Sequence, residues 1–299
     1  MQILVTGATG FVGRSLVPAL LEAGYDVRAL TRDRSTGRAR LDDRVEVVEG
    51  DVLEPESLAG VFADVDLAYY LVHSLGAGAE FEAKDREAAA NFADAASEAG
   101  VERVIYLGGL GETGTDLSPH LKSRQEVETY LAEGDYELTT FRAAIIVGAG
   151  SESFEMVRQL VTRLPVMITP RWVRTPSQPI AIRDVIEYMV QAIEVPETAG
   201  RTLEIGGPEI LSYEEMMRRT AAALGRRLYI LPVPVLTPKL SVYWIDLVTN
   251  TPPSISHPLI EGLRNPVVVT DHTAEELLDV ELTPFDEAVE RAVANARDE

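Results

Sequence analysis

Short apolar runs alternate with amphipathic stretches over the first 150 residues of the chain. The runs predict β-strands at residues 2–6, 26–31, 45–49, 67–71, 103–107 and 137–142. Between them, helices are expected at residues 11–22 and 80–98, which stop at Gly24 and Gly100, as helices with glycine C-caps do. This alternation is typical of a parallel sheet covered by helices on both faces. We therefore predict an α/β fold with a doubly wound parallel sheet.

The alternation loosens after Gly150, where prolines accumulate. Short strands are still expected at residues 177–182 and 201–205, followed by a helix that Ser212 caps. The pattern predicts one domain over residues 1–150 and a smaller C-terminal α/β lobe, partly interleaved with it, over residues 151–299.

Two apolar segments, at residues 228–248 and 252–263, are interrupted or preceded by prolines. Such segments suit the wall of a pocket or a contact between subunits, for example in a homodimer. An alternative is a role at a membrane surface, because Tyr243 and Trp244 stand beside leucine and valine.

Composition excludes several classes of protein. The chain has no uncharged apolar run of about 18 residues and no basic, cleavable leader, so we expect a soluble, cytoplasmic protein without an integral membrane segment. It has no cysteine, which excludes disulfides, thiolate metal sites and a thiol nucleophile. The four histidines are scattered along the chain, so no metal site is expected. Redox chemistry would have to come from a cofactor.

The formal net charge is −21, from 48 acidic and 27 basic residues, and only Lys84, Lys122 and Lys239 are lysines. An acidic surface poor in lysine suits a halophilic protein that stays soluble at multimolar salt, where self-repulsion is screened. The alternative is an ordinary acidic protein from a GC-rich genome. In either case the charge argues against nucleic acid as the main partner.

A glycine-rich loop follows the first predicted strand and opens the first helix, with glycines at Gly7, Gly10 and Gly13. Gly7 allows a tight exit from the strand, Gly10 lets the backbone approach a diphosphate, and Gly13 lets the helix pack closely on the sheet. The amides at the start of the helix then donate to phosphate oxygens. This is the Rossmann pattern for NAD(P), and its expected contacts are Gly7, Thr9, Gly10, Phe11, Val12 and Gly13.

The end of the second strand distinguishes NADP from NAD, because an acid there would bind the ribose 2′-hydroxyl and repel a 2′-phosphate. The sequence has Thr31 at that position, followed by Arg32, which can bind a phosphate through two N–H groups. NADP is therefore favoured, with NAD as the alternative if Asp33 binds the ribose. Asp51, followed by Val52, closes the third strand, where it could bind the adenine amino group or cap the next helix.

Together these segments resemble the atypical and extended short-chain dehydrogenase/reductases, including their NmrA-like and nucleotide-sugar epimerase branches. The resemblance covers most of the chain and rests on residues 6–13, 50–51, 70–74, 106–110, 141–143 with Gly148, 182–185 and 203–208. It implies an NAD(P)-binding enzyme and places Leu71 and Val72, after the fourth strand, beside the cofactor. Residues 71–75 and 118–126 are most similar to an atypical, epimerase-like subfamily.

Active members of this family use a tyrosine and a lysine four residues later, which exchange a proton with the substrate oxygen and hold the ribose. The matching positions here are His120 and Arg124. Arginine can hold a ribose but cannot exchange a proton, whereas histidine can act as an acid or base. Other candidates for proton transfer are Tyr106, His73, Ser74 and Lys122, although Tyr106 could be a core aromatic residue and His73 could cap a loop.

Two functions fit these residues. The first is an NADP-dependent oxidoreductase or epimerase-like enzyme that acts on a small carbonyl or alcohol substrate bound between the lobes. The second is a non-catalytic NADP(H)-binding protein, such as a redox sensor or an assembly factor, which the loss of the tyrosine and lysine pair would favour.

Overall fold

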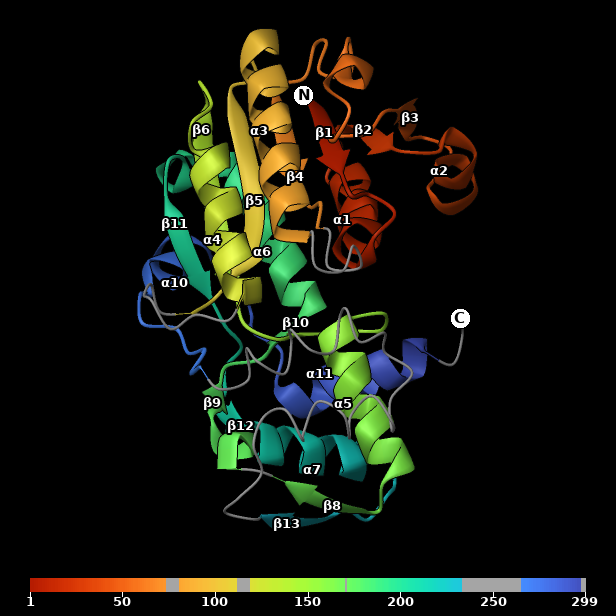
Figure 1. The fold of residues 1–299 in the computed structure, drawn as a ribbon, viewed down its shortest axis with the longest axis vertical. Helices are drawn as coiled ribbons and strands as arrows, with labels where there is room; N and C mark the ends of the chain where they lie inside the picture. Colours follow the sequence, from red (N-terminus) through yellow and green to blue (C-terminus); the bar gives the residue numbers. More distant parts are fainter. Residues whose placement is uncertain (74–80, 112–118, 170, 233–264, 297–299) are drawn as a thin grey trace.

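Seven parallel strands form the central sheet in the order β11-β6-β5-β4-β1-β2-β3. The computed structural model describes residues 1–73, 81–111, 119–169, 171–232 and 265–296 (Figure 1). The sheet strands are β1 (Gln2–Thr6), β2 (Asp26–Thr31), β3 (Glu46–Glu49), β4 (Leu67–Tyr70), β5 (Arg103–Gly109), β6 (Glu137–Ala143) and β11 (Thr202–Ile205). The doubly wound α/β fold is thereby confirmed.

Helices cover both faces of the sheet because apolar side chains of its strands, such as β1, point to both faces. Ile3 and Val5 pack in the core beneath α1 (Phe11–Glu22) and α6 (Ile182–Glu194). Leu4 points to the opposite face, in the core beneath α3 (Phe81–Ala99) and α4 (Pro119–Leu131). The peripheral helices are α2 (Arg34–Arg40) and α10 (Thr273–Leu277), and the short 3-10 turns are η1 (Pro55–Leu58), η3 (Arg171–Arg174) and η4 (Pro196–Thr198).

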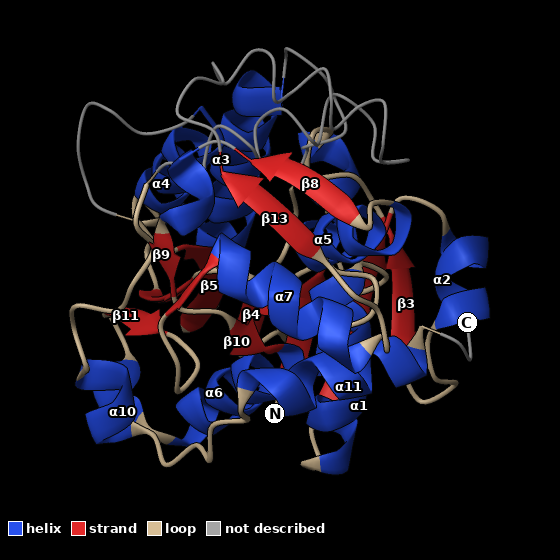
Figure 2. Ribbon diagram, turned by 90° about the horizontal axis from the view of Figure 1, so that it is seen from below, coloured by secondary structure: helices blue, strands red, loops and turns tan. Residues whose placement is uncertain are grey.

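The C-terminal lobe has a separate core, below the sheet in Figure 1. Its helices are α5 (Glu152–Arg163), α7 (Tyr213–Ala223) and α11 (Phe285–Asn295), and β8 (Val166–Thr169) pairs with β13 (Tyr229–Pro232), as Figure 2 also shows. The remaining strands are β7 (Ile146–Val147), β9 (Pro176–Ser177), β10 (Ile180–Ala181) and β12 (Leu211–Ser212). Because β11 belongs to the main sheet and pairs with β6, the lobe is intergrown with the sheet; the domain division at residue 150 stays a prediction.

Most predicted elements agree with the structure, and one does not. The single strand expected at residues 177–182 is instead two short strands, β9 and β10, and Ile182 already begins α6. Pro179 lacks the N–H of a continuous ladder, and the Gln178 side chain turns to Gly207 and Val269, where it donates to one backbone and accepts from the other. The predicted apolar segments fall mostly on residues 233–264, outside the described residues. No helix in the described part of the chain is long and apolar enough to cross a membrane.

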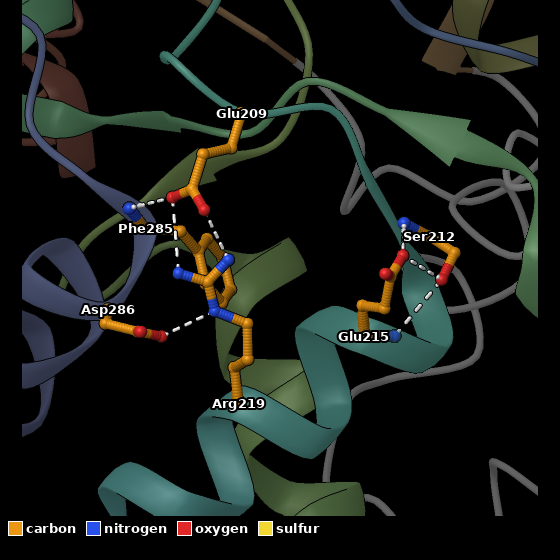
Figure 3. Close-up of polar contacts among 6 residues, drawn as sticks. All are labelled: Glu209, Ser212, Glu215, Arg219, Phe285 and Asp286. Carbon is orange, nitrogen blue, oxygen red and sulfur yellow. Dashed lines mark hydrogen bonds and ion pairs between the residues drawn. The ribbon is translucent and has the colours of Figure 1, made fainter.

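One arginine joins three segments of the lobe (Figure 3). Arg219 on α7 donates from Nη1 to Oε1 of Glu209 over 2.6 Å and from Nε to Oδ1 of Asp286 over 2.6 Å. Its guanidinium also lies 5.2 Å from the ring centre of Phe285, whose backbone N–H donates to Glu209. Ser212 begins α7 with a reciprocal capping box to Glu215, which confirms the predicted cap. Side-chain bonds thus hold the lobe's helices in place beside the sheet.

We expect Arg219→Gln to lower the free energy of unfolding by about 1 kcal/mol, because it removes charged hydrogen bonds from the partly buried Glu209 and the more exposed Asp286. Among the described residues, the neighbouring Arg218 pairs with Glu214 of its own helix, so Arg218→Gln should change the value by less than about 0.5 kcal/mol. Urea denaturation of both variants measures this difference. Equal losses would show that Arg219 does not join the segments energetically.

Candidate functional site

The site lies at the carboxyl edge of the sheet, between β1 and β4. These strands are neighbours, but the order of strands runs in opposite directions on either side of them, so their following loops diverge and leave a crevice. The buried Thr6 hydroxyl donates to the Tyr69 carbonyl over 3.0 Å and accepts from the Leu71 amide over 3.2 Å. This bridge fixes the exits of both strands relative to each other.

The loop between β1 and α1 leaves no room for side chains at two of its glycines. Gly7 has φ +68°, and a Cβ there would lie 2.6 Å from the Leu71 carbonyl oxygen. A Cβ at Gly13 would lie 2.3 Å from the Gly7 carbonyl oxygen, so α1 can approach the strand only because Gly13 has none. At Gly10 a Cβ would lie 3.1 Å from that same oxygen, and no other heavy atom of the described residues beyond its neighbours along the chain lies within 4 Å of it. This glycine is where the backbone can approach a ligand.

The amino terminus of α1 faces this space with its amides uncapped. Gly10 is the N-cap residue and has no side chain to bond them, and the first turn contains no acidic residue. A helix start without its own acceptor attracts an anion through its N–H groups and its dipole. The glycine cradle and the uncapped helix therefore fit the diphosphate of a dinucleotide.

A cavity of about 480 Å³ extends from this loop into the C-terminal lobe. Gly7, Gly10 and Gly13 line one end, together with the ends of β4, β5 and β6. The other end is lined by α5, α7 and Val267. The cavity is thus built jointly by the sheet and the lobe, at the place where a substrate would meet a bound dinucleotide.

The structure brings several of the predicted site residues together. Phe11, Val12, Leu71 and Arg124 all line the cavity. Arg32 lies apart from it, in a shallow depression at the end of β2. Of the other candidates, Thr9 is half-buried, Val52 and Val72 pack in or against the core beneath α3, and Asp51 accepts from the Leu53 amide over 3.0 Å in a turn before η1.

Two residues predicted to take part in proton transfer, Tyr106 and His120, lie on β5 and α4. Tyr106 is fully buried beneath α3 and α4, and its hydroxyl donates to the Arg124 carbonyl over 3.2 Å. Burial raises its pKa, and it does not line the cavity, so its placement is that of a core residue. His120 belongs to α4, but its side chain lies outside the described residues. Both assignments to catalysis remain untested predictions.

His73, another candidate for proton transfer, has a polar partner in the structure. His73, three residues after β4, lines the cavity, and its Nδ1 lies 2.9 Å from Oδ2 of Asp85 on α3. Burial, and then the positive charge of Arg124, lower the pKa of His73 to about 4, although Asp85 acts in the opposite direction. The pairing with Asp85 joins two elements of the fold, so no local sequence pattern could reveal it.

Glu152 adds one carboxylate to the same cavity, at the start of α5. Burial raises its pKa, and the charge of Arg124 opposes this shift. Within the described ranges, no group of three or more potential ligands is arranged to hold a metal ion. The titratable groups described at the cavity include His73, Glu152 and Arg124.

A doubly wound sheet with a glycine cradle at its switch point defines an NAD(P)-binding Rossmann protein of the dehydrogenase/reductase and epimerase class. Within this class the chain belongs to the NmrA-like family, whose profile matches residues 1–250. The resemblance seen in the sequence is thereby confirmed.

The relatives of the chain include both assembly factors and reductases. It is 23% identical over 244 residues to the photosystem II assembly factor Ycf39 of Trieres chinensis, covering 80% of this chain and 74% of the relative. It is 28% identical over 255 residues to the ceramide reductase of Caulobacter vibrioides, covering 84% and 80%. Its fold is similar to triphenylmethane reductase of Citrobacter sp., with a TM-score of 0.80, 19% identity and coverage of 98% and 100%.

The low pKa of His73 makes the stability of the protein depend on pH. An unfolded imidazole has a pKa of about 6.5, so between pH 6.5 and about 4 the unfolded chain binds more protons than the folded one. The free energy of unfolding should therefore be fully present above pH 6.5 and fall by up to about 3 kcal/mol as the pH drops to 4.

His73→Asn should remove this contribution to the pH dependence. Denaturation of the wild type and the variant across this pH range measures the difference. His272, which has a 60% exposed side chain, provides the matched control, and His272→Asn should keep the wild-type slope. A wild-type slope retained in His73→Asn would contradict the assignment.

Proposed function

We propose that the protein is an NADP-dependent oxidoreductase that acts on a carbonyl or alcohol carbon of a small, largely apolar molecule. The observation that carries this proposal is the cavity that joins the glycine cradle to the wall of the lobe. In this assignment, the loop from Gly7 to Gly13 binds the diphosphate and Arg124 holds the nicotinamide ribose. The nicotinamide, when bound, supplies or accepts the hydride.

The preference for NADP rests on the residues at the end of β2. The Thr31 hydroxyl is engaged with the Asp33 carbonyl over 3.0 Å, so it is turned back into its own loop. The Asp33 carboxylate accepts from Ser35 and Thr36 at the start of α2, which leaves it engaged as a cap and not as a ribose ligand. Three arginines, Arg32, Arg34 and Arg38, line the depression together with Asp33 and Glu49, so a 2′-phosphate would meet three guanidinium groups there.

The substrate class rests on the far wall of the cavity. Its described side chains include Ile146, Met156, Val157, Leu160, Met217 and Val267. Such a wall binds hydrocarbon by removing it from water. Among the described lining residues, Arg124 is the one cation and Glu152 the one anion. A nucleotide sugar brings two phosphates, which these groups would not neutralise, so an oxidoreductase is favoured over a nucleotide-sugar epimerase.

The second candidate function is a non-catalytic dinucleotide-binding protein. It is favoured by the absence of the tyrosine and lysine pair at residues 120 and 124 and by the similarity to an assembly factor. Turnover of a substrate separates the two functions, because only the first requires hydride transfer.

The cofactor assignment predicts that Arg32→Gln weakens the binding of NADPH about ten-fold and changes the binding of NADH little, because the variant loses a charged contact with the 2′-phosphate alone. Calorimetric titration with both dinucleotides measures this. Arg40→Gln removes an equally exposed arginine of α2 outside the depression and should bind NADPH as the wild type does. Equal weakening for both dinucleotides would contradict the assignment.

The substrate class can be tested with NADPH and 2-alkanones of increasing length. We expect kcat/KM to rise about four-fold for each added methylene until the cavity is filled. Absorbance of the reduced nicotinamide measures the rate, and UDP-glucose should be neither consumed nor inhibitory. Met217→Gln, which makes one wall residue polar at similar volume, should flatten the rise, whereas the exposed Arg218→Gln should not.

The results of the 2-alkanone series can also contradict the proposed substrate class or the proposed function. Turnover of UDP-glucose, or rates that do not depend on chain length, would overturn the apolar substrate class. Tight binding of NADPH without turnover of any substrate would favour the non-catalytic function.

A further inference from the structure

His73 is placed where it can act on a substrate beside the dinucleotide. It follows β4, the strand that borders the crevice, and lines the same cavity as the glycine cradle and Arg124. Its side chain is only 13% exposed, so its surroundings are set by the protein. The residue therefore combines a place in the cavity wall with a fixed position, and its Nε2 atom is buried there.

The fixed position comes from Asp85. This carboxylate is 2% exposed, and its Oδ2 lies 2.9 Å from Nδ1 of His73 and accepts from the hydroxyl of Ser123 on α4 over 3.1 Å. Taking a carboxylate out of water is unfavourable unless donors replace the water. Residues from the β4 loop and from α4 supply such donors, so two further segments of the chain converge on this one side chain of α3.

This geometry determines which ring nitrogen can take up a proton. An ionised carboxylate only accepts, so the ring hydrogen of a neutral His73 stands on Nδ1 and the lone pair on Nε2. Among the described residues, Asp85 from α3 and Arg124 from α4 act on the ring by their charge, and α5 brings Glu152 to the same cavity. The ring is thus held neutral and oriented, as histidine is in hydrolases where an aspartate holds its other nitrogen.

We propose that His73, positioned by Asp85, is the residue that exchanges a proton with the substrate oxygen, in place of the tyrosine of related enzymes. This rests on the proposed function. When an alcohol is oxidised, its carbon gives up a hydride to the oxidised nicotinamide and its hydroxyl proton passes to Nε2 of His73, leaving a carbonyl. In the reverse direction Nε2 returns the proton to the carbonyl oxygen.

His73→Asn is the informative substitution, because the asparagine amide can place an N–H near the position of Nδ1 and keep the bond to Asp85 while Nε2 is lost. We expect kcat to fall by about 100- to 1000-fold, the usual contribution of an acid or base, with the affinity for NADPH unchanged within about three-fold. The acidic limb of the kcat profile should disappear. His272→Asn, at the exposed residue that precedes α10, should leave kcat and the profile unchanged.

Asp85→Asn tests the positioning role separately. It keeps the volume but removes the charge that fixes the ring hydrogen on Nδ1, so we expect a smaller loss of kcat and a shifted acidic limb, again with NADPH still bound. A loss of NADPH binding in either variant would show that the pair only supports the cofactor site, which would overturn the proposal.

Imidazole ¹⁵N spectra test the orientation of the ring even if no substrate is turned over. The signals of His73 are those that vanish in His73→Asn, and they should show the Nδ1–H tautomer at neutral pH. An Nε2–H tautomer, or a kcat in His73→Asn within about three-fold of the wild type, would overturn the assignment. Failure of the proposed function would look different, because NADPH would then bind without turnover while the tautomer remained as expected.

Discussion

The close approach of three pieces of backbone, at the exits of β1 and β4 and at the start of α1, is the constraint on which the site depends. A Cβ at Gly13 would lie 2.3 Å from the Gly7 carbonyl oxygen, and a Cβ at Gly7 would lie 2.6 Å from that of Leu71. Only hydrogen fits at either position. The compact loop that results exposes the first amides of α1 to the crevice, so the anion-binding property of the site follows from steric exclusion before any side chain contributes.

The C-terminal lobe completes the site because it is held against this crevice from two directions. Strand β11 joins the sheet beside β6, so the chain returns to the main sheet after building part of the lobe. Arg219 then ties α7 to the loop at Glu209 and to the start of α11. The apolar wall on α5 and α7 is therefore presented to the cradle by a framework that includes both the sheet ladder and the side-chain bonds.

Local features of the sequence predicted the local features of the structure. The bounds of β1, β2 and α1 agree residue for residue with the expected ranges, because strand, glycine loop and helix cap are all encoded within a few neighbouring residues. The break between β9 and β10 was missed although Pro179, which has no N–H for a ladder, stands inside the predicted strand; Gln178 beside it bonds to Gly207 and Val269, far along the chain. The place of β11 beside β6 is also a non-local pairing, which periodicity does not contain.

The difference between local and non-local features also decides which parts of the candidate site could be predicted from the sequence. The cradle was predictable, but Tyr106 and His73 could not be ranked from the sequence. In a parallel sheet buried on both faces, apolar runs do not show which residues point to which face. Tyr106 points to the face covered by α3 and α4 and is buried in the core there. His73 follows the end of β4 and lines the cavity. Whether a polar residue is part of the site thus depends on one or two positions along a strand.

The charges in the cavity indicate how its residues could replace the tyrosine and lysine pair. Arginine keeps its proton at any ordinary pH, so Arg124 can attract an anionic group but cannot relay a proton. Its charge also disfavours a second cation nearby, which is one cause of the lowered pKa of His73. On the proposed assignment the two tasks of the lost pair are therefore divided: the permanent charge resides on α4, and the exchangeable proton on a ring that Arg124 itself helps to keep neutral. A neutral ring of lowered pKa is ready to take up the alcohol proton at neutral pH, and its protonated form then gives that proton up readily.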